Sequence, residues 1–119
     1  MRSLLVCATC LVGACLSERP RPAPPQIGIV FAKPAVQSPD TLRGSVQAQD
    51  PDGVDSVWLT VGSGPTLGDD GLFETEFSAP FQVLIPRGYA PGERIPVTIR
   101  ARDVVGFTDE LDTLIRVSQ

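Results

Sequence analysis

The chain has 119 residues, of which ten are basic, 14 are acidic, three are cysteine and none is histidine, and its formal net charge is −4 at pH 7. A mildly acidic chain without basic clusters argues against nucleic acid as a partner. The lack of histidine excludes Ser-His-Asp and Cys-His nucleophiles and the usual His/Cys zinc sites. Short strands with brief turns leave little material for two carboxylates opposed across a sugar-sized cleft, so we expect no enzyme.

The first 15 residues have the order of an export signal. Arg2 precedes an apolar run at 4–14, which is too short to span a bilayer. The sequence "VGAC" at 12–15 resembles the lipobox of bacterial lipoproteins. This resemblance implies cleavage before Cys15 and a lipid on Cys15, which would anchor the protein at a bacterial cell envelope. Leu16 is compatible, by resemblance to the sorting rule of diderm lipoproteins, with the outer membrane.

An ordinary signal peptidase site after Gly13 or Ala14 is the alternative, and it would release a soluble secreted domain with a free thiol. With the lipobox cleavage, the signal peptide (1–14) removes Cys7 and Cys10 and leaves 105 residues with a net charge of −5. The lipidated cysteine and a linker with four prolines (15–26) would follow, either as an extended spacer of about 30 Å or as disordered filler. The rest of the chain, 27–119, has the size of one domain without a disulfide.

Beyond the linker, the sequence predicts short strands and no helix. The stretches at 41–49 and 94–103 alternate apolar and polar residues, which is the period of a strand with one buried face. The glycine-rich stretch at 62–71 predicts a long turn. Seven strands are expected, at 27–32, 41–49, 54–61, 72–77, 81–86, 94–103 and 112–118.

Seven short strands with turns between them predict an all-β sandwich. The phrases "VQAQDPDGVDSVWLTV" (46–61) and "APGERIPVTIRARDVVGFTDE" (90–110) resemble bacterial immunoglobulin-like and fibronectin-type-III-like domains. The resemblance implies a seven-stranded immunoglobulin-like β-sandwich over 27–118. It also implies a non-enzymatic binding or structural accessory module, whose partner is a protein, a glycan or a second copy.

Four aspartates are expected at one end of such a sandwich, because the turn after the second strand and the turn after the sixth strand lie together in this fold. Asp50 and Asp52 belong to the first turn, and Asp103 and Asp109 to the second. They are candidate ligands for Ca²⁺, which takes about 6 to 8 oxygen ligands. The Asp-x-Asp phrase resembles cadherin-like adhesive domains, although their other ligand motifs are missing. The alternative is that these aspartates only build turns.

The only tryptophan, Trp58, is the centre of a second candidate site. The strand at 54–61 is more continuously apolar at Val57, Leu59 and Val61, which predicts that Trp58 points outward. Tryptophan and arginine dominate binding hot spots. The alternative is a buried tryptophan, which this fold often has on its third strand. If Trp58 points outward, the expected binding surface consists of Trp58, Arg100, Arg102 and Arg116.

Overall fold

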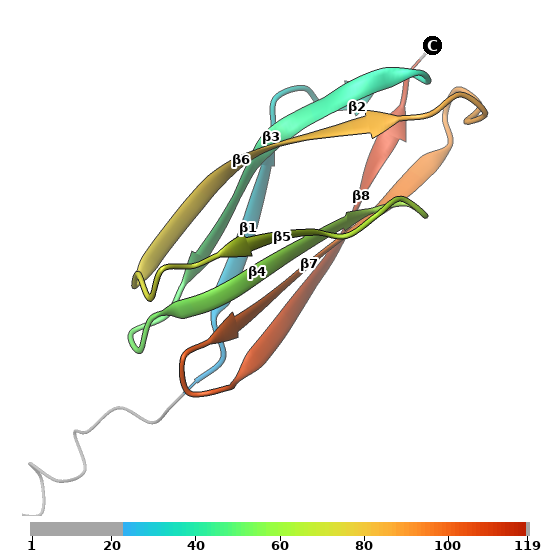
Figure 1. Ribbon diagram of the computed structural model, residues 1–119. Coiled ribbons are helices and arrows are strands. Elements are labelled where there is room, and N and C mark those ends of the chain that lie inside the picture. Colours follow the sequence, from blue (N-terminus) through green and yellow to red (C-terminus); the bar gives the residue numbers. More distant parts are fainter. Residues whose placement is uncertain (1–22, 119) are drawn as a thin grey trace, which may run out of the picture.

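The computed structural model describes residues 23–118, which form two packed β-sheets and no helix (Figure 1). The predicted signal peptide, Cys15 and most of the predicted linker lie outside the described residues. One sheet has the order β1-β3-β6 and the other has the order β2-β8-β7-β4-β5. Among the described residues, no helix is long and apolar enough to cross a membrane. The strands are β1 (Gln26–Phe31), β2 (Ala35–Val36), β3 (Asp40–Gln49), β4 (Val54–Val61), β5 (Leu67–Asp70), β6 (Glu76–Ile85), β7 (Arg94–Asp103) and β8 (Thr108–Val117).

The core lies between the two sheets and is built by the alternation that the sequence displays. On β7, every second residue from Ile95 to Ala101 is fully buried, and the residues between them face outward. On β4, a register shift between Val54 and Ser56 resets the alternation, so that Val54 and Val57 are both buried. The prediction of an all-β sandwich is therefore confirmed.

The strand boundaries differ from the prediction in the middle of the chain. The two strands expected at 72–77 and 81–86 are parts of one strand, β6, which continues through Pro80. Pro80 is tolerated because β6 is an edge strand that pairs only with β3, so one side of its backbone needs no donor. Residues 72–75 belong to the loop before β6 instead.

Further differences concern short or exposed strands. The strand β5 lies within the stretch expected to be a long turn, and all four of its residues are exposed. Its only neighbour is β4, so no buried face marks it in the sequence. The two-residue β2 was not predicted, and β8 begins at Thr108, before the expected residue 112.

Three loops meet at the end of the sandwich where the described chain begins (Figure 1). They are the β3–β4 turn (50–53), the β5–β6 loop (71–75) and the β7–β8 loop (104–107). The strand β1 starts at this end as well, because Gln26 pairs with Gln49, the residue before the β3–β4 turn. We call this end the N-terminal pole.

Candidate functional site

Three of the four predicted aspartates meet at the N-terminal pole. Asp50, Asp52 and Asp103 each place a carboxylate oxygen within 4.8 Å of the other two. Asp50 and Asp103 are each only 1% exposed, whereas Asp52 is exposed. Asp109 does not join this group, because it lies on β8 opposite Ala101 with an exposed side chain. We call Asp50, Asp52 and Asp103 the acidic cluster.

The two buried aspartates each use one carboxylate oxygen to shape a turn. Asp50 Oδ1 accepts a hydrogen bond of 2.8 Å from the backbone N–H of Asp52. Asp103 Oδ1 accepts hydrogen bonds of 3.1 Å and 2.8 Å from the backbone N–H groups of Val105 and Phe107. Both aspartates therefore stabilise turns, as the alternative prediction from the sequence expected.

The second oxygen of each buried aspartate has no such role. Asp50 Oδ2 and Asp103 Oδ2 are both buried and accept no hydrogen bond from any described residue. Buried polar atoms without a partner are rare, since they lose their contacts with water and gain nothing in return. Two such atoms lie in one cluster with the Asp52 carboxylate beside them. This arrangement is compatible with a proton shared between the acids or with a bound cation.

The raised pKa of Asp50 also indicates that the cluster favours an added positive charge, either a proton or a cation. Burial raises the pKa of Asp50, the N–H of Asp52 partly offsets this, and the carboxyl of Asp103 raises it further. A divalent cation would relieve both the burial and the repulsion, because it places positive charge between the carboxylates. Three carboxylates supply part of the oxygen set of Ca²⁺, which is completed in many proteins by backbone carbonyls and water.

Trp58 is half-buried on the outer face of the larger sheet, while Val57 and Leu59 on either side of it are buried in the core. The guanidinium carbon of Arg100 lies 5.5 Å from the centre of the indole ring, in a cation–π contact. On the other side, Trp58 lies against Gly68 of β5. A shallow hollow here is lined by Trp58, Thr60, Thr66, Thr98, Arg100 and Glu110.

The predicted arginines are only partly gathered around Trp58. Arg102 lies next to Arg100 on the same face of β7, opposite Ser56. Arg116 pairs with Arg94 towards the other end of β8, whereas Arg100 pairs with Glu110. Six residues of strand, or about 20 Å, separate those two positions on β8. The surface around Trp58 therefore contains Arg100 and Arg102 but not Arg116.

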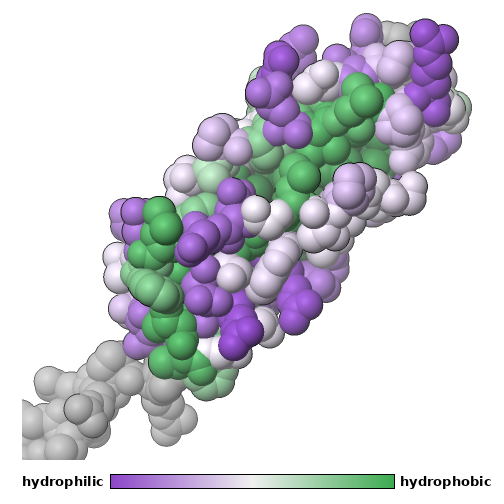
Figure 2. All heavy atoms as spheres, viewed as in Figure 1, coloured by the Kyte–Doolittle hydropathy of each residue, from purple (hydrophilic) through white to green (hydrophobic). Residues whose placement is uncertain are grey.

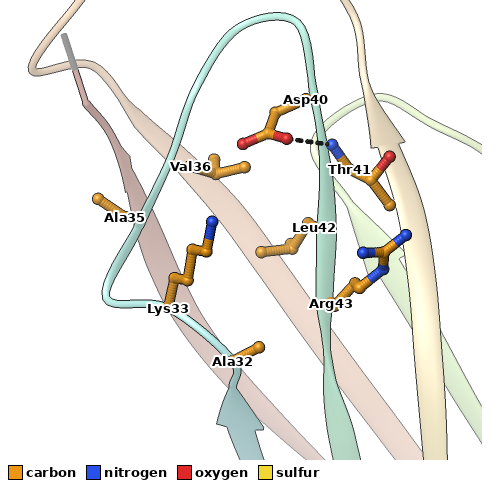
Figure 3. A pocket seen from close by; sticks show the side chains of 8 residues that line it. All are labelled: Ala32, Lys33, Ala35, Val36, Asp40, Thr41, Leu42 and Arg43. Atoms are coloured by element: carbon orange, nitrogen blue, oxygen red, sulfur yellow. Dashed lines mark hydrogen bonds between the residues drawn. The ribbon is translucent and has the colours of Figure 1, made fainter.

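A hollow at the opposite pole contains the only lysine of the chain (Figure 3). Lys33 extends towards Asp40, whose Oδ1 accepts a 2.8 Å hydrogen bond from the N–H of Thr41. The N–H groups of Gln37 and Thr41 hold the pKa of Asp40 below its usual range, and Lys33 and Arg43 lower it further. Asp40 thus shapes this loop and offsets part of the positive charge beside it.

The apolar side chains of the N-terminal pole are not among the site residues that the sequence predicted. The sequence predicts Leu72 and Phe73 to lie in a strand, but in the structure both are exposed in the β5–β6 loop. On the β7–β8 loop, Val104, Val105 and Phe107 are exposed as well. The sequence signal was present in "GLF" and "DVVGF", where apolar residues occur inside turns.

No protein-family model and no curated protein sequence matches this chain. Solved structures do share its fold. The PKD domain of an M14-like peptidase from a Thermoplasmatales archaeon is 14% identical, with a TM-score of 0.60 over 82% of this chain and 96% of that one. The sporulation control protein Spo0M from Bacillus subtilis is 11% identical, with a TM-score of 0.57 over 82% and 50%.

The PKD domain of the human VPS10 domain-containing receptor SorCS2 is also similar, with 19% identity and a TM-score of 0.52 over 82% of this chain and 74% of that one. At these identities the likeness concerns the fold alone. The chain therefore has an immunoglobulin-like β-sandwich of the kind found in PKD domains, as the sequence predicted.

Proposed function

We propose that this protein is a lipid-anchored, non-enzymatic accessory module of a bacterial cell envelope, whose N-terminal pole is stabilised by calcium. The lipobox-like "VGAC" at 12–15 supports the anchor on Cys15, and Leu16 supports an outer-membrane address. The likeness to PKD domains of larger proteins supports the role of an accessory module.

The observation that carries the calcium proposal is the pair of buried, unpartnered oxygens, Asp50 Oδ2 and Asp103 Oδ2, beside Asp52. Turn chemistry accounts for one oxygen of each buried aspartate, and it leaves the other oxygen of each without a function. A hard divalent cation bound by these oxygens would compensate both carboxylates, whose burial and repulsion otherwise raise the pKa of Asp50 and favour its protonated form.

Thermal unfolding with and without calcium tests this proposal. Because a ligand that binds only the folded state stabilises it, Ca²⁺ at about 100 times its dissociation constant adds about 2.7 kcal/mol to the free energy of unfolding. We expect a higher melting temperature in millimolar calcium for the wild type and no increase for the double variant Asp50→Asn, Asp103→Asn. Asp109→Asn is the matched control, since it removes an acid outside the cluster and should keep the full increase. A wild-type melting curve that calcium leaves unchanged would contradict the proposal.

A second candidate function is recognition of a protein or glycan partner by the surface around Trp58. The specific observation in its favour is the stack of Trp58 and Arg100 beside the threonine-lined hollow. Aromatic rings and guanidinium groups are frequent anchors in binding sites. Partners that copurify with the intact lipidated protein and are lost with Trp58→Ala would support this function.

A further inference from the structure

Five large apolar side chains stand exposed on two loops of the N-terminal pole. Leu72 and Phe73 of the β5–β6 loop are 66% and 69% exposed. Val104, Val105 and Phe107 of the β7–β8 loop are 41%, 56% and 44% exposed. Figure 2 shows apolar surface at the end where the described chain begins, and a second apolar area farther along the sandwich. We call these two loops the apolar loops.

The apolar loops are fixed by backbone hydrogen bonds to Gly53 and Val54, where the β3–β4 turn meets β4. The N–H of Phe73 donates to the carbonyl of Val54 over 3.0 Å, and the N–H of Val54 donates to the carbonyl of Glu74 over 2.8 Å. The N–H of Val104 donates to the carbonyl of Gly53, again over 3.0 Å. Both apolar loops are therefore held at the same pole, and we call their exposed side chains the apolar patch.

The backbone of the β5–β6 loop is held in an unfavourable conformation. Leu72 and Phe73 have φ angles of +56° and +59°, in the left-handed region that residues with a side chain adopt at a cost. A hydrogen bond from the N–H of Leu72 to Asp70 Oδ1, and one from the N–H of Glu74 to the carbonyl of Gly71, close this turn. Strain of this kind is typical of functional loops, and here it directs two large apolar side chains into solvent.

The point at which the N-terminal segment joins the described chain indicates what covers the patch. Residues 1–22 join the domain at this pole, and the lipobox cleavage would leave 15–22 of them, beginning with Cys15. Only ten residues separate Cys15 from Gln26, and they span at most about 36 Å. A lipid on Cys15 would therefore keep the N-terminal pole, rather than the opposite one, close to the bilayer.

We propose that the apolar loops insert into the bilayer that holds the anchor, with Leu72 and Phe73 reaching the boundary between headgroups and acyl chains. The proposal rests on the lipid anchor of the proposed function. The three loops of this pole, with the strand ends at 69–70 and 103 beside them, contain no lysine or arginine and several acids. The patch therefore suits zwitterionic headgroups and is repelled by anionic ones in the absence of calcium.

Fluorescence quenching by brominated acyl chains tests this contact. The full chain, processed and modified as in its host, is reconstituted into phosphatidylcholine vesicles with bromine on the acyl chains. Phe73→Trp places an indole on the β5–β6 loop, and Val105→Trp places one on the other apolar loop in case the first variant misfolds. Leu84→Trp is the matched control, because Leu84 is 73% exposed but pairs with Thr41 at the opposite pole.

We expect bromine to quench the added indole of Phe73→Trp and Val105→Trp at least twofold, and to leave Leu84→Trp and the wild-type Trp58 emission unchanged. Sedimentation of the vesicles reports the anchor separately. Protein that sediments with vesicles without quenching at either loop position overturns the insertion and leaves the anchor intact. If bromine quenches the added indole but the protein does not sediment stably with the vesicles, the anchor is overturned and the contact of the apolar loops with the bilayer is supported. Neither sedimentation nor quenching overturns both.

Discussion

Truncation of Trp58 and of its neighbour Val57 separates a surface role from a core role on the same strand. Val57 is 1% exposed, and its replacement by alanine removes two methyl groups from the packed core between the sheets. At about 0.8 kcal/mol for each buried group plus the cost of the cavity, Val57→Ala should lower the free energy of unfolding by about 2 to 3 kcal/mol.

Trp58 is the larger residue, but it is half-buried on the outer face, where it contacts Arg100 and Gly68. An exposed cation–π contact contributes about 0.5 to 1 kcal/mol. Together with the loss of partial packing against β5, Trp58→Ala should cost about 1 to 2 kcal/mol. Urea unfolding followed by circular dichroism measures both variants without relying on tryptophan emission.

If Trp58 faces outward, Trp58→Ala should lower the free energy of unfolding by less than Val57→Ala does. A buried tryptophan would cost about 3 to 5 kcal/mol on truncation, a large part of the stability of a domain whose described residues contain no disulfide. Such a value for Trp58→Ala would refute the outward assignment and with it the binding surface around Trp58. Iodide quenching of the single indole is an independent check, since iodide reaches an outward-facing, partly exposed ring but not a ring in the core.

Two further predictions concern pH and the anchor. Because the pKa of Asp50 is raised in the folded state, the folded protein keeps a proton that the unfolded chain releases near pH 4, so the calcium-free protein should lose stability as pH rises from about 4 through the raised pKa. The free energy of unfolding of the wild type and of Asp50→Asn is measured in a chelator at each pH, and the difference between the two proteins isolates the effect of Asp50 from the opposite effect of Asp40. A difference that stays constant between pH 4 and 7 would contradict the prediction. For the anchor, Cys15→Ala should abolish lipid labelling and leave the precursor uncleaved, and labelling of that variant would show that Cys15 is not the attachment site.

The fold was predictable where one face of a strand is buried along its whole length. On β3 and β7 the apolar residues recur at every second position, because each strand has neighbours on both sides and one face on the core. The strands β5 and β6 lie at sheet edges, where proline and exposed residues are tolerated. Their sequences therefore carry turn signals inside strands, and the predicted boundaries were wrong there.

The acidic cluster was predictable in part, since the topology of the sandwich brings the β3–β4 turn and the end of β7 together. The position of Asp109 was not predictable. Because β8 begins four residues earlier than expected, Asp109 lies within the strand, opposite Ala101, and not in the turn. The apolar loops were missed for a related reason. Leu72 and Phe73 have the composition of a strand, and the left-handed turn is fixed by local hydrogen bonds to Asp70 and Gly71 together with backbone hydrogen bonds to Val54 of β4.

The acidic cluster and the apolar loops are parts of one structure, which couples the two proposals. Asp103 Oδ1 holds the N–H groups of Val105 and Phe107, while Asp103 Oδ2 belongs to the acidic cluster. A cation bound to the cluster would therefore stiffen the β7–β8 loop and neutralise charge beneath it. If calcium raises the affinity of the protein for the bilayer by some factor, then by linkage the bilayer must raise the affinity of the protein for calcium by the same factor. Asp103→Asn keeps an oxygen for the loop and removes a charge from the cluster, so it should preserve the shape of the loop and abolish the calcium dependence of its quenching by brominated lipid.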